Sequence, residues 1–500
     1  MEHLPSYMYV KSLVKSLLNA KSFDHEDINE HIAEHIAAKL FLDILNKRFS
    51  LLENGLSKLP TNLYQYSASG LSLDLNQGVI SLKRSLFVKK LLLGFLVVFI
   101  MFLCLVLPRR KNLNSKKIAV IFGLTSDQIF KEKSVASLSD FLSDKRFKFN
   151  SEVNFYLVES RSSRHGMKHK EDNLITTFDI ALYLYKNFLN KSDQLRLSLS
   201  AFSSFTNLLL HHKKNNAQIF RVKDLILDAP LAKILTNDSR IKHLIITPSN
   251  ILAKSMLYSI WKNTASSSMI WYSGNSIPIM HIGQFRELVD QSFYDISHAD
   301  SHYVWSDAHK TYLQSFTESK VIKIGSMMFY PKELSNGPVK DFTLLICDVT
   351  PMIQRSYQKS IYSLALMLNF LQDLEYVQNY LKTANVQPIC WRLKPKREYT
   401  KHHCSEYVSK LQTMKLDLID PKVDLYQCIE NANFVVCVPY TSPAIIAQEL
   451  GIPVCYFSTA TEFDLLESLD GIPVHKSIEA LIAHIECALE DYSQAESRES

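Results

Sequence analysis

The stretch "NANFVVCVPYTSPAIIAQELGIPVCYF", residues 431–457, holds the residue types best suited to bind an anion. An apolar run at 434–438 meets the polar turn Pro439-Tyr440-Thr441-Ser442-Pro443, and an alanine-rich amphipathic segment follows. Pro443 suits the first turn of a helix, so we predict that Thr441 or Ser442 lies at or just before the N-cap. Hydroxyls and free amides then meet at the positive end of the helix dipole, which favours a phosphate. An ordinary capped helix fits the same residues.

A second cationic segment, "CWRLKPK" at 390–396, reads as the end of a strand. Alternate residues of a strand share a face, so Arg392, Lys394 and Lys396 are expected to point together. We predict that this strand neighbours the one ending at Val438, which brings its cations to the same phosphate. A solvated basic loop is the alternative interpretation.

Several common sites are unsupported by the sequence. Only 12 glycines occur in 500 residues, with no GxGxxG, no phosphate-binding P-loop and no D-x-D pair. His211-His212 and His402-His403-Cys404 lack a second pair of ligands, so we predict no metal site and no cofactor. The eight cysteines have no CxxC spacing and several lie in apolar runs, which indicates reduced thiols in a cytosolic compartment. The net charge of +6 is small for this length, so nucleic acid is not an expected partner.

The elements that must position these residues alternate in type. Short apolar runs such as "KKIAVIFGL", "VNFYLVES", "HLIITPSN", "HYVWSDA" and "VIKIGS" are separated by helix-length segments from residue 116 onward. After a linker-like run at 330–341 the pattern restarts with "FTLLICDVT" and a long helix near 356–384. Strands that alternate with helices predict parallel βαβ units. We therefore expect an α/β protein with two Rossmann-like domains, 116–335 and 340–490, facing a cleft.

The first 107 residues have a different character. Residues 1–90 read as mainly helical, with an apolar stripe at Ile28, Ile32, Ile36, Leu40 and Ile44, and short strands or turns after it. Residues 91–107 are 17 uncharged residues between basic clusters, at the short edge of the length that spans a bilayer. A membrane segment is predicted, either spanning or re-entrant. Positive charge on both sides leaves its orientation open.

The order of several motifs resembles one known family. "PYTSPAIIAQELGIPVCYF" resembles the PFTS-type motif of bacterial surface polysaccharide biosynthesis proteins, with Tyr440 in place of the usual phenylalanine. "MIWYSGNS", "HYVWSDAHKTYL" and "VIKIGSMMF" are similar to the middle of these proteins. The resemblance covers about residues 116 to 460 and implies a GT-B glycosyltransferase, in which the C-terminal domain binds a nucleotide sugar without a metal ion.

The resemblance also implies roles for single residues. Arg392, Lys394, Thr441 and Ser442 are expected to contact the donor phosphates. Glu449, two helical turns after Ser442, corresponds to a carboxylate that holds ribose hydroxyls in many GT-B enzymes, although it lies far from the helix start.

A transferase also needs a base for the acceptor hydroxyl, and a loop after an N-terminal strand is the place to expect it. Glu159 and His165, in "LVESRSSRHGMKHKED", are the candidates. Polar residues that end further strands are candidates for the acceptor or the cleft: Asn250, Ser273, Asn275 and Asp348.

Together these features predict a membrane-attached glycosyltransferase of surface polysaccharide or lipopolysaccharide synthesis. It would move a sugar from a nucleotide-activated donor to a lipid-linked or outer-core saccharide, in contact with membrane lipid. The expected location is the bacterial inner membrane, with the catalytic domains on the cytoplasmic side. The alternatives are a polyol-phosphate transferase, a sugar epimerase and a non-catalytic membrane scaffold of an assembly complex.

Overall fold

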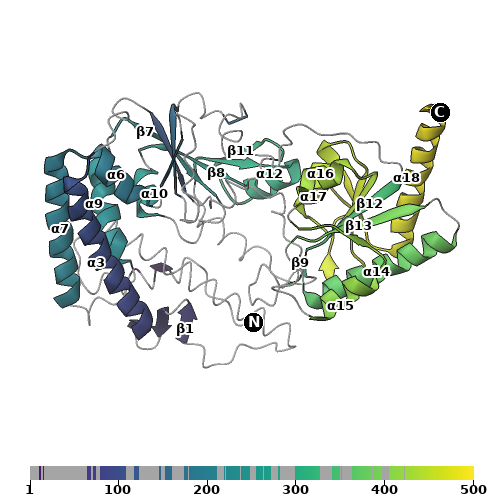
Figure 1. Ribbon diagram of the computed structural model, residues 1–500, viewed down its shortest axis with the longest axis horizontal. Helices are drawn as coiled ribbons and strands as arrows, with labels where there is room; N and C mark the ends of the chain where they lie inside the picture. Colours follow the sequence, from purple (N-terminus) through teal and green to yellow (C-terminus); the bar gives the residue numbers. More distant parts are fainter. Residues whose placement is uncertain are drawn as a thin grey trace. The chain divides into compact units, whose positions relative to one another are not determined.

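The computed structural model describes 65–68, 71–74, 79–108, 117–122, 146–147, 153–159, 174–177, 179–210, 219, 221–236, 238–247, 255–262, 264–271, 280–281, 299–326, 341–349, 351, 363–384, 388–396, 405–421 and 423–499, besides 11, 12 and 15. The chain divides into two compact units. The first comprises Met1–Phe130, Leu142–Ile270 and Glu287–His302, and the second Lys131–Phe141, Trp271–Arg286 and Tyr303–Ser500. Figure 1 labels their helices and strands.

The first seven-stranded sheet has the strand order β11-β10-β8-β7-β4-β5-β6. Its strands are β4 (Ile118–Phe122), β5 (Phe155–Glu159), β6 (Leu174–Thr177), β7 (Ile241–Ile246), β8 (Ser266–Ile270), β10 (Ser301–Val304) and β11 (Lys320–Lys323). β4 pairs in parallel with β5 and β7, and β7 with β8. All five residues of β4 are buried, as expected for a central strand covered on both faces.

Helices surround this sheet. They are α6 (Ile180–Phe188), α7 (Lys191–Leu210), α9 (Ala229–Leu235), α10 (Met256–Trp261), α12 (Asp307–Gln314) and the π-helix η3 (Asp224–Asp228). Polar side chains begin several of them because the first helical amides lack partners within the helix. Asp179 accepts from the Leu182 amide at 3.0 Å to begin α6, and Ser306 accepts from the His309 amide at 3.1 Å to begin α12.

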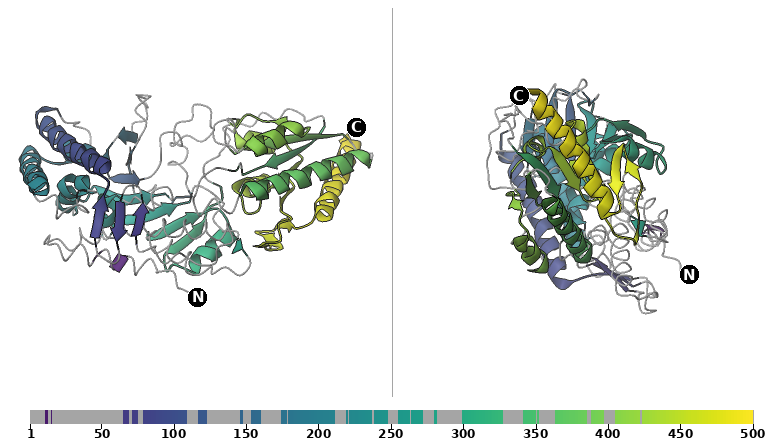
Figure 2. Two further views of the ribbon diagram at one scale, coloured as in Figure 1. Left: turned by 90° about the horizontal axis from the view of Figure 1, so that it is seen from below. Right: turned by 90° about the vertical axis from the view of Figure 1, so that its right-hand side faces the viewer.

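Helix α3 (Arg84–Val106) contains the predicted membrane segment. It is long and apolar enough to cross a membrane, and 22% of its most apolar stretch is buried inside the protein. α3 lies beside α7 in the first unit, as Figures 1 and 2 both show. Before it, β1 (Gln65–Ala68), β2 (Leu71–Asp74) and β3 (Val79–Leu82) form a small antiparallel sheet. These agree with the short strands expected there, whereas the apolar stripe from Ile28 to Ile44 lies outside the described residues.

Gly94 sets how closely α3 approaches its neighbours. A Cβ atom at this position would lie 2.5 Å from Cε2 of Phe205 and 2.9 Å from Cγ2 of Val222. Both distances are below van der Waals contact, so a larger residue must push α3 away from α7. The glycine therefore permits the close packing of these two helices.

We predict that Gly94→Leu lowers the stability of the first unit by about 1–3 kcal/mol, as overpacking does in other cores. Thermal unfolding of the detergent-solubilised protein measures the effect. Phe95→Leu is the control, because the side chain of the adjacent Phe95 is 63% exposed. Equal unfolding temperatures for Gly94→Leu and the control would show that the close approach is unimportant.

The second unit contains another seven-stranded sheet, in the order β14-β13-β12-β15-β16-β19-β18. Its strands are β12 (Phe342–Cys347), β13 (Ile389–Lys394), β14 (Asp417–Leu418), β15 (Phe434–Cys437), β16 (Val454–Phe457), β18 (Ser468–Leu469) and β19 (Ile472–His475). The strands from β14 to β19 pair in parallel, and β18 joins antiparallel at the edge. Two short strands, β9 (Met280–His281) and β17 (Phe463–Asp464), form a separate pair.

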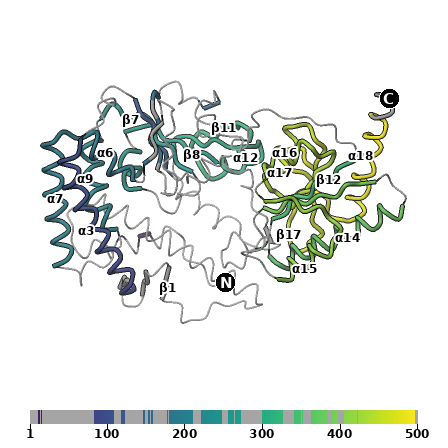
Figure 3. The backbone as a smooth tube through the Cα atoms, viewed as in Figure 1, coloured from purple at the N-terminus to yellow at the C-terminus, as the bar shows by residue number. Residues whose placement is uncertain are grey.

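Helices cover both faces of the second sheet, as Figure 3 traces. They are α14 (Leu364–Thr383), α15 (Ser405–Thr413), α16 (Leu425–Glu430), α17 (Ser442–Glu449) and α18 (Ile478–Glu499). Residues of α14, α15 and α18 pack with Leu344, Phe434 and Phe457 in one core cluster. α17 packs on β15 and β16 and also contacts α16. The observed architecture is therefore α/β with two parallel sheets, as the alternating apolar runs predicted.

Candidate functional site

The turn at 439–442, called the motif turn below, lies at the carboxyl end of β15, near the middle of the second sheet. Thr441 is the N-cap residue of α17, and Pro443 lies in the first helical turn, as predicted. The Thr441 hydroxyl does not cap the helix amides, because it donates to the Val438 carbonyl at 2.7 Å. Ligands of open α/β sheets bind beyond the carboxyl ends of the strands, which is where this turn lies.

Tyr440 has an unusual backbone conformation. Its φ is +60°, in the left-handed region that bulky residues rarely adopt. Its side chain is 3% exposed, lies edge-on to the Tyr456 ring at 5.8 Å between centroids, and accepts a hydrogen bond from the Leu466 amide at 2.8 Å. Strained residues persist only where their surroundings hold them, and they cluster at functional sites. The turn is therefore fixed in shape by the packing of its own tyrosine.

We predict that Tyr440→Phe lowers stability by about 1–2 kcal/mol, because the Leu466 amide loses its buried acceptor. The turn itself should keep its shape, since the ring that fixes it is retained. Tyr456→Phe is the control: it removes the hydroxyl of the neighbouring ring, whose contact with the Thr441 carbonyl is long, at 3.4 Å. Denaturant unfolding of the two variants and the parent protein measures the difference. A Tyr440→Phe variant no less stable than Tyr456→Phe would contradict the assignment.

The strand carrying the predicted cations does not neighbour β15, and this expectation was wrong. β13 pairs with β12, and β12 pairs with β15, so one whole strand separates the two. Two strand spacings amount to about 10 Å. The apolar pattern shows that each of these strands is buried, but it does not tell which strand lies beside which.

Arg392 lies on β13 beside the edge strand. Its Nε donates to Oδ2 of Asp417 at 2.8 Å, and its side chain is 32% exposed. Trp391 and Leu393 on the same strand belong to the core cluster, so by strand alternation Arg392 and Lys394 share the opposite face. The strand that underlies this expectation is present and contains both residues, while Lys396 follows its end.

Lys394 and Asp348 hold loops at the carboxyl edge of the sheet. Lys394 is 7% exposed, and its Nζ donates to the Pro421 carbonyl at 2.8 Å. Asp348, 5% exposed, accepts from the Lys396 amide at 2.9 Å and from the Tyr407 hydroxyl. The two side chains thus fix the segments after β13 and β14.

Glu449 contacts another motif of the second unit. Its Oε1 accepts from the Ser326 amide at 2.9 Å, and its Oε2 accepts from the Ser326 hydroxyl. The same hydroxyl contacts the Tyr426 hydroxyl of α16. Both carboxylate oxygens of Glu449 are therefore engaged by the end of the "VIKIGS" segment, so we assign this residue a positioning role.

A neighbouring contact holds the helix of the "HYVWSDAHKTYL" segment. Asp470 accepts from the Ala308 amide, in the first turn of α12, at 2.7 Å, and its own carbonyl accepts from Gln448 at 2.7 Å. Asp470 also has a positive φ, +55°. The end of α17 and the turn before β19 thus hold two segments that the sequence had singled out.

The predicted acceptor residues are less completely described. Glu159 is the last residue of β5, as expected, and pairs with Thr177 of β6. His165, Asn250, Ser273 and Asn275 lie outside the described residues. Their roles stay predictions.

A buried polar seam in the first sheet gave no signal in the sequence. Nε2 of His243 on β7 lies 2.8 Å from the Ser268 hydroxyl of β8, which lies 2.8 Å from the Ser301 hydroxyl of β10. Asp300 accepts from the Ser267 amide and hydroxyl at 2.7 and 3.0 Å. These residues lie at the amino ends and middles of the strands rather than at the carboxyl edge. Burial lowers the pKa of His243 to about 4, so the imidazole is neutral in the fold.

The seam makes stability depend on pH. An unfolded histidine has a pKa near ~6.5 and takes up its proton first as the pH falls, which favours the unfolded state. Stability should be complete above pH ~6.5 and fall by about 3 kcal/mol between pH ~6.5 and ~4 from His243 alone. Unfolding temperatures across this range, compared with His243→Gln, measure the contribution. An identical pH dependence in both proteins would show that His243 does not contribute to it.

The described residues also contain a buried charge cluster in the first unit. Nζ of Lys223 lies 2.9 Å from Asp179 and 3.2 Å from Asp228, joining α6 to the π-helix. Burial raises the pKa of Asp228, and the charge of Lys223 opposes this rise. Because Asp228 is 2% exposed, the cluster is a packing feature rather than an accessible base.

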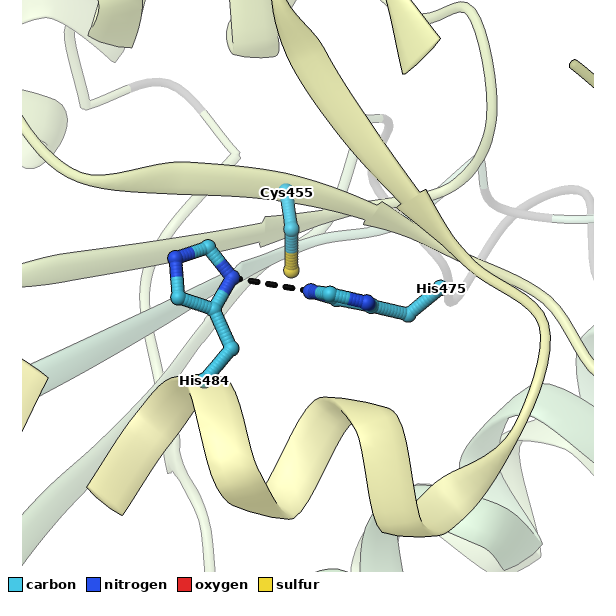
Figure 4. A group of neighbouring side chains, drawn as sticks. All are labelled: Cys455, His475 and His484. Atoms are coloured by element: carbon cyan, nitrogen blue, oxygen red, sulfur yellow. Dashed lines mark hydrogen bonds between the residues drawn. The ribbon is translucent and has the colours of Figure 1, made fainter. Parts of the chain in front are cut away.

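One group of potential metal ligands occurs in the described part of the chain: Cys455 on β16, His475 on β19 and His484 on α18 (Figure 4). Their ligand atoms lie within 4.8 Å of one another. Nε2 of His475 and Nδ1 of His484 already share a hydrogen bond of 2.8 Å. Burial lowers the pKa of both imidazoles and raises that of the fully buried Cys455 thiol, so burial favours the neutral form of all three. A metal ion would have to break this hydrogen bond and displace the thiol proton to solvent.

Solved structures with similar folds are remote. A crystal structure of TarM has 14% identity over 53% of this chain and 52% of its own, with a TM-score of 0.33. The wall teichoic acid polymerase TagF has 12% identity over 83% and 92%, with a TM-score of 0.37. A putative UDP-N-acetylglucosamine 2-epimerase from Listeria monocytogenes has 10% identity over 75% and 88%, with a TM-score of 0.38. This chain spans about half the length of TarM, and similarity at this level does not establish a shared activity.

Sequence comparison is more informative. No curated protein matches the chain significantly. The family of polysaccharide biosynthesis PFTS motif proteins matches residues 209–485, more than half of the chain and including the turn at 439–442. The chain is therefore a member of the polysaccharide biosynthesis PFTS motif family.

Proposed function

We propose that this protein is a membrane-attached glycosyltransferase that binds the diphosphate of a nucleotide sugar at the turn 439–442. The observation that carries the proposal is the strained motif turn at the carboxyl end of β15, where Tyr440 adopts a φ of +60° immediately before α17. Membership of a polysaccharide biosynthesis family supports sugar transfer as the reaction class.

The turn suits a diphosphate for electrostatic reasons. The first amides of a helix lack intrahelical partners and carry about half a positive charge. The Thr441 hydroxyl is directed to the Val438 carbonyl rather than to the amides of the first turn of α17. Pro443 has no amide hydrogen, and the Ala444 amide donates to the Thr441 carbonyl at 3.3 Å, so the attraction for phosphate comes from the helix dipole rather than from a set of open amides. In this proposal the turn and the α17 dipole bind the phosphates without a divalent metal ion, and Thr441 fixes the shape of the turn.

The remaining predicted residues have different roles in this proposal. Ser442, the first residue of α17, contacts the phosphates. Lys394 orders the loop at Pro421 and adds positive charge at the sheet edge, whereas Arg392 lies farther away beside Asp417. Asp348 holds the segment after β13. Glu159 or His165 of the first unit serves as the base that deprotonates the acceptor hydroxyl.

The acceptor is a saccharide, lipid-linked or on an outer core, at the cytoplasmic face of a bacterial inner membrane. A lipid-linked acceptor confines transfer to the bilayer surface, and the apolar α3 accounts for attachment there. The seven cysteines of the described residues are free, which suits a reducing compartment. A polyol-phosphate transferase would use the same diphosphate-binding turn with a different transferred group.

Ser442→Asp tests the donor site. A carboxylate at a helix N-terminus favours the helix but repels a diphosphate, so folding should persist while nucleotide affinity falls at least about tenfold. Calorimetry with UDP, GDP and CDP, and with CMP, measures binding to the full-length protein. Ser363→Asp is a matched control, because Ser363 begins α14 of the same unit by accepting from the Leu366 amide at 3.1 Å.

Equal nucleotide affinity in Ser442→Asp and Ser363→Asp would show that the donor does not bind at this turn. Absence of binding by every nucleotide to the parent protein would overturn the transferase proposal and favour a non-catalytic scaffold.

A further inference from the structure

Large hydrophobic side chains are exposed mainly on two adjacent helices of the first unit, α3 and α7. Nine of those found among the described residues lie on α3 or its C-cap, five lie on α7, and five lie elsewhere. The most exposed members of the two helices are Leu92 (63%), Phe95 (63%), Val106 (81%), Phe202 (55%) and Leu210 (72%). A soluble monomer rarely exposes so many together, so this α3–α7 face marks an interaction surface.

The opposite side of α3 packs against protein. Gly94, Val97, Val98, Met101 and Cys104 are buried. Both faces of α3 are thus apolar: one packs against the rest of the first unit, and the other is exposed. The exposed face continues onto α7 through Leu195, Leu199, Phe202 and Leu209, at the spacing of one helical stripe.

Polar contacts also attach α3 to this unit. The Tyr185 hydroxyl of α6 donates to the Met101 carbonyl at 3.2 Å. Nζ of Lys191, at the start of α7, donates to the carbonyls of Cys104 at 3.2 Å and Leu107 at 3.4 Å, and also contacts that of Leu105. α7 also packs along α3, with Phe205 beside Gly94. If α3 crossed the bilayer in this packing, it would take α7 into hydrocarbon with it, where the exposed Arg196 and the serines of α7 are costly.

Charge completes the amphipathic pattern. Lys83, Arg84 and Lys89 are exposed near the start of α3, and Lys191 and Arg196 are exposed near its end. α3 carries no acidic residue. Cations at both ends of an apolar stripe suit a helix that lies in the plane of a membrane with anionic headgroups.

We propose that the α3–α7 face is immersed in one leaflet of an anionic membrane, so that α3 does not span the bilayer and both of its ends stay on the same side. The proposal deepens the membrane attachment of the proposed function, but its test does not depend on nucleotide binding or transfer. It adds α7, which the sequence did not single out, as half of the attachment surface.

The first test is flotation of the full-length protein with preformed phosphatidylcholine–phosphatidylglycerol vesicles. Leu199→Glu combined with Phe202→Glu changes only exposed α7 positions and should reduce the vesicle partition coefficient about a hundredfold or more. Tyr376→Glu, at a 58% exposed position of α14, is the matched control and should float like the parent. Circular dichroism establishes that each variant is folded.

Undiminished flotation of the α7 variant would overturn the proposal and favour attachment through α3 alone. Failure of the parent to float, with a dimer that the α7 variant converts to a monomer in ultracentrifugation, would also overturn it and assign the face to a second copy of this chain.

The second test locates the ends of α3. Lys83→Cys and Pro108→Cys are made separately, bound to the outside of sealed vesicles, and treated with a membrane-impermeant maleimide. Mass spectrometry identifies the labelled peptide, because Cys390 and Cys487 are exposed as well. Labelling of both positions before the vesicles are lysed supports immersion in one leaflet. If one position is labelled before lysis and the other only after lysis, α3 spans the bilayer and the proposal is wrong.

Discussion

The Glu449 carboxylate joins parts of the second unit that lie far apart in the sequence. Its two oxygens accept from the amide and hydroxyl of Ser326, 123 residues earlier in the chain. Glu449 ends the helix that the motif turn begins, so the turn, α17 and the "VIKIGS" segment form one connected structure. A hydrogen bond to a charged acceptor contributes about 1.5–3 kcal/mol, more than an ordinary one, and here it also sets the position of the helix. The strained Tyr440 lies at the other end of that helix.

The strands were predictable from the sequence because burial on both faces leaves a simple signal. Runs such as "IAVIF" and "FTLLIC" are apolar at nearly every position, and β4 and β12 are buried along their whole length. The order of the strands was not predictable in the same way. An apolar run reports that a strand is covered, but not which strand lies beside it, so β12 between β13 and β15 was missed.

The candidate site was predictable in place but not in detail. The proline and hydroxyl pattern located the start of α17 correctly. The direction of each hydroxyl and ammonium group was not readable, since Thr441 turns to the Val438 carbonyl and Lys394 to the Pro421 carbonyl. Such contacts depend on backbone groups brought close by folding, and side-chain types alone do not encode them. The polar seam of His243 escaped notice for the same reason.

The ammonium group of Lys191 has a consequence for the length of α3. The last carbonyls of a helix normally require water or a continued chain, which is why spanning helices extend to the headgroups. Here a lysine from another helix supplies the donor. The number of apolar residues in α3 is therefore not a measure of bilayer thickness, and a segment of this length can end wherever α7 meets it.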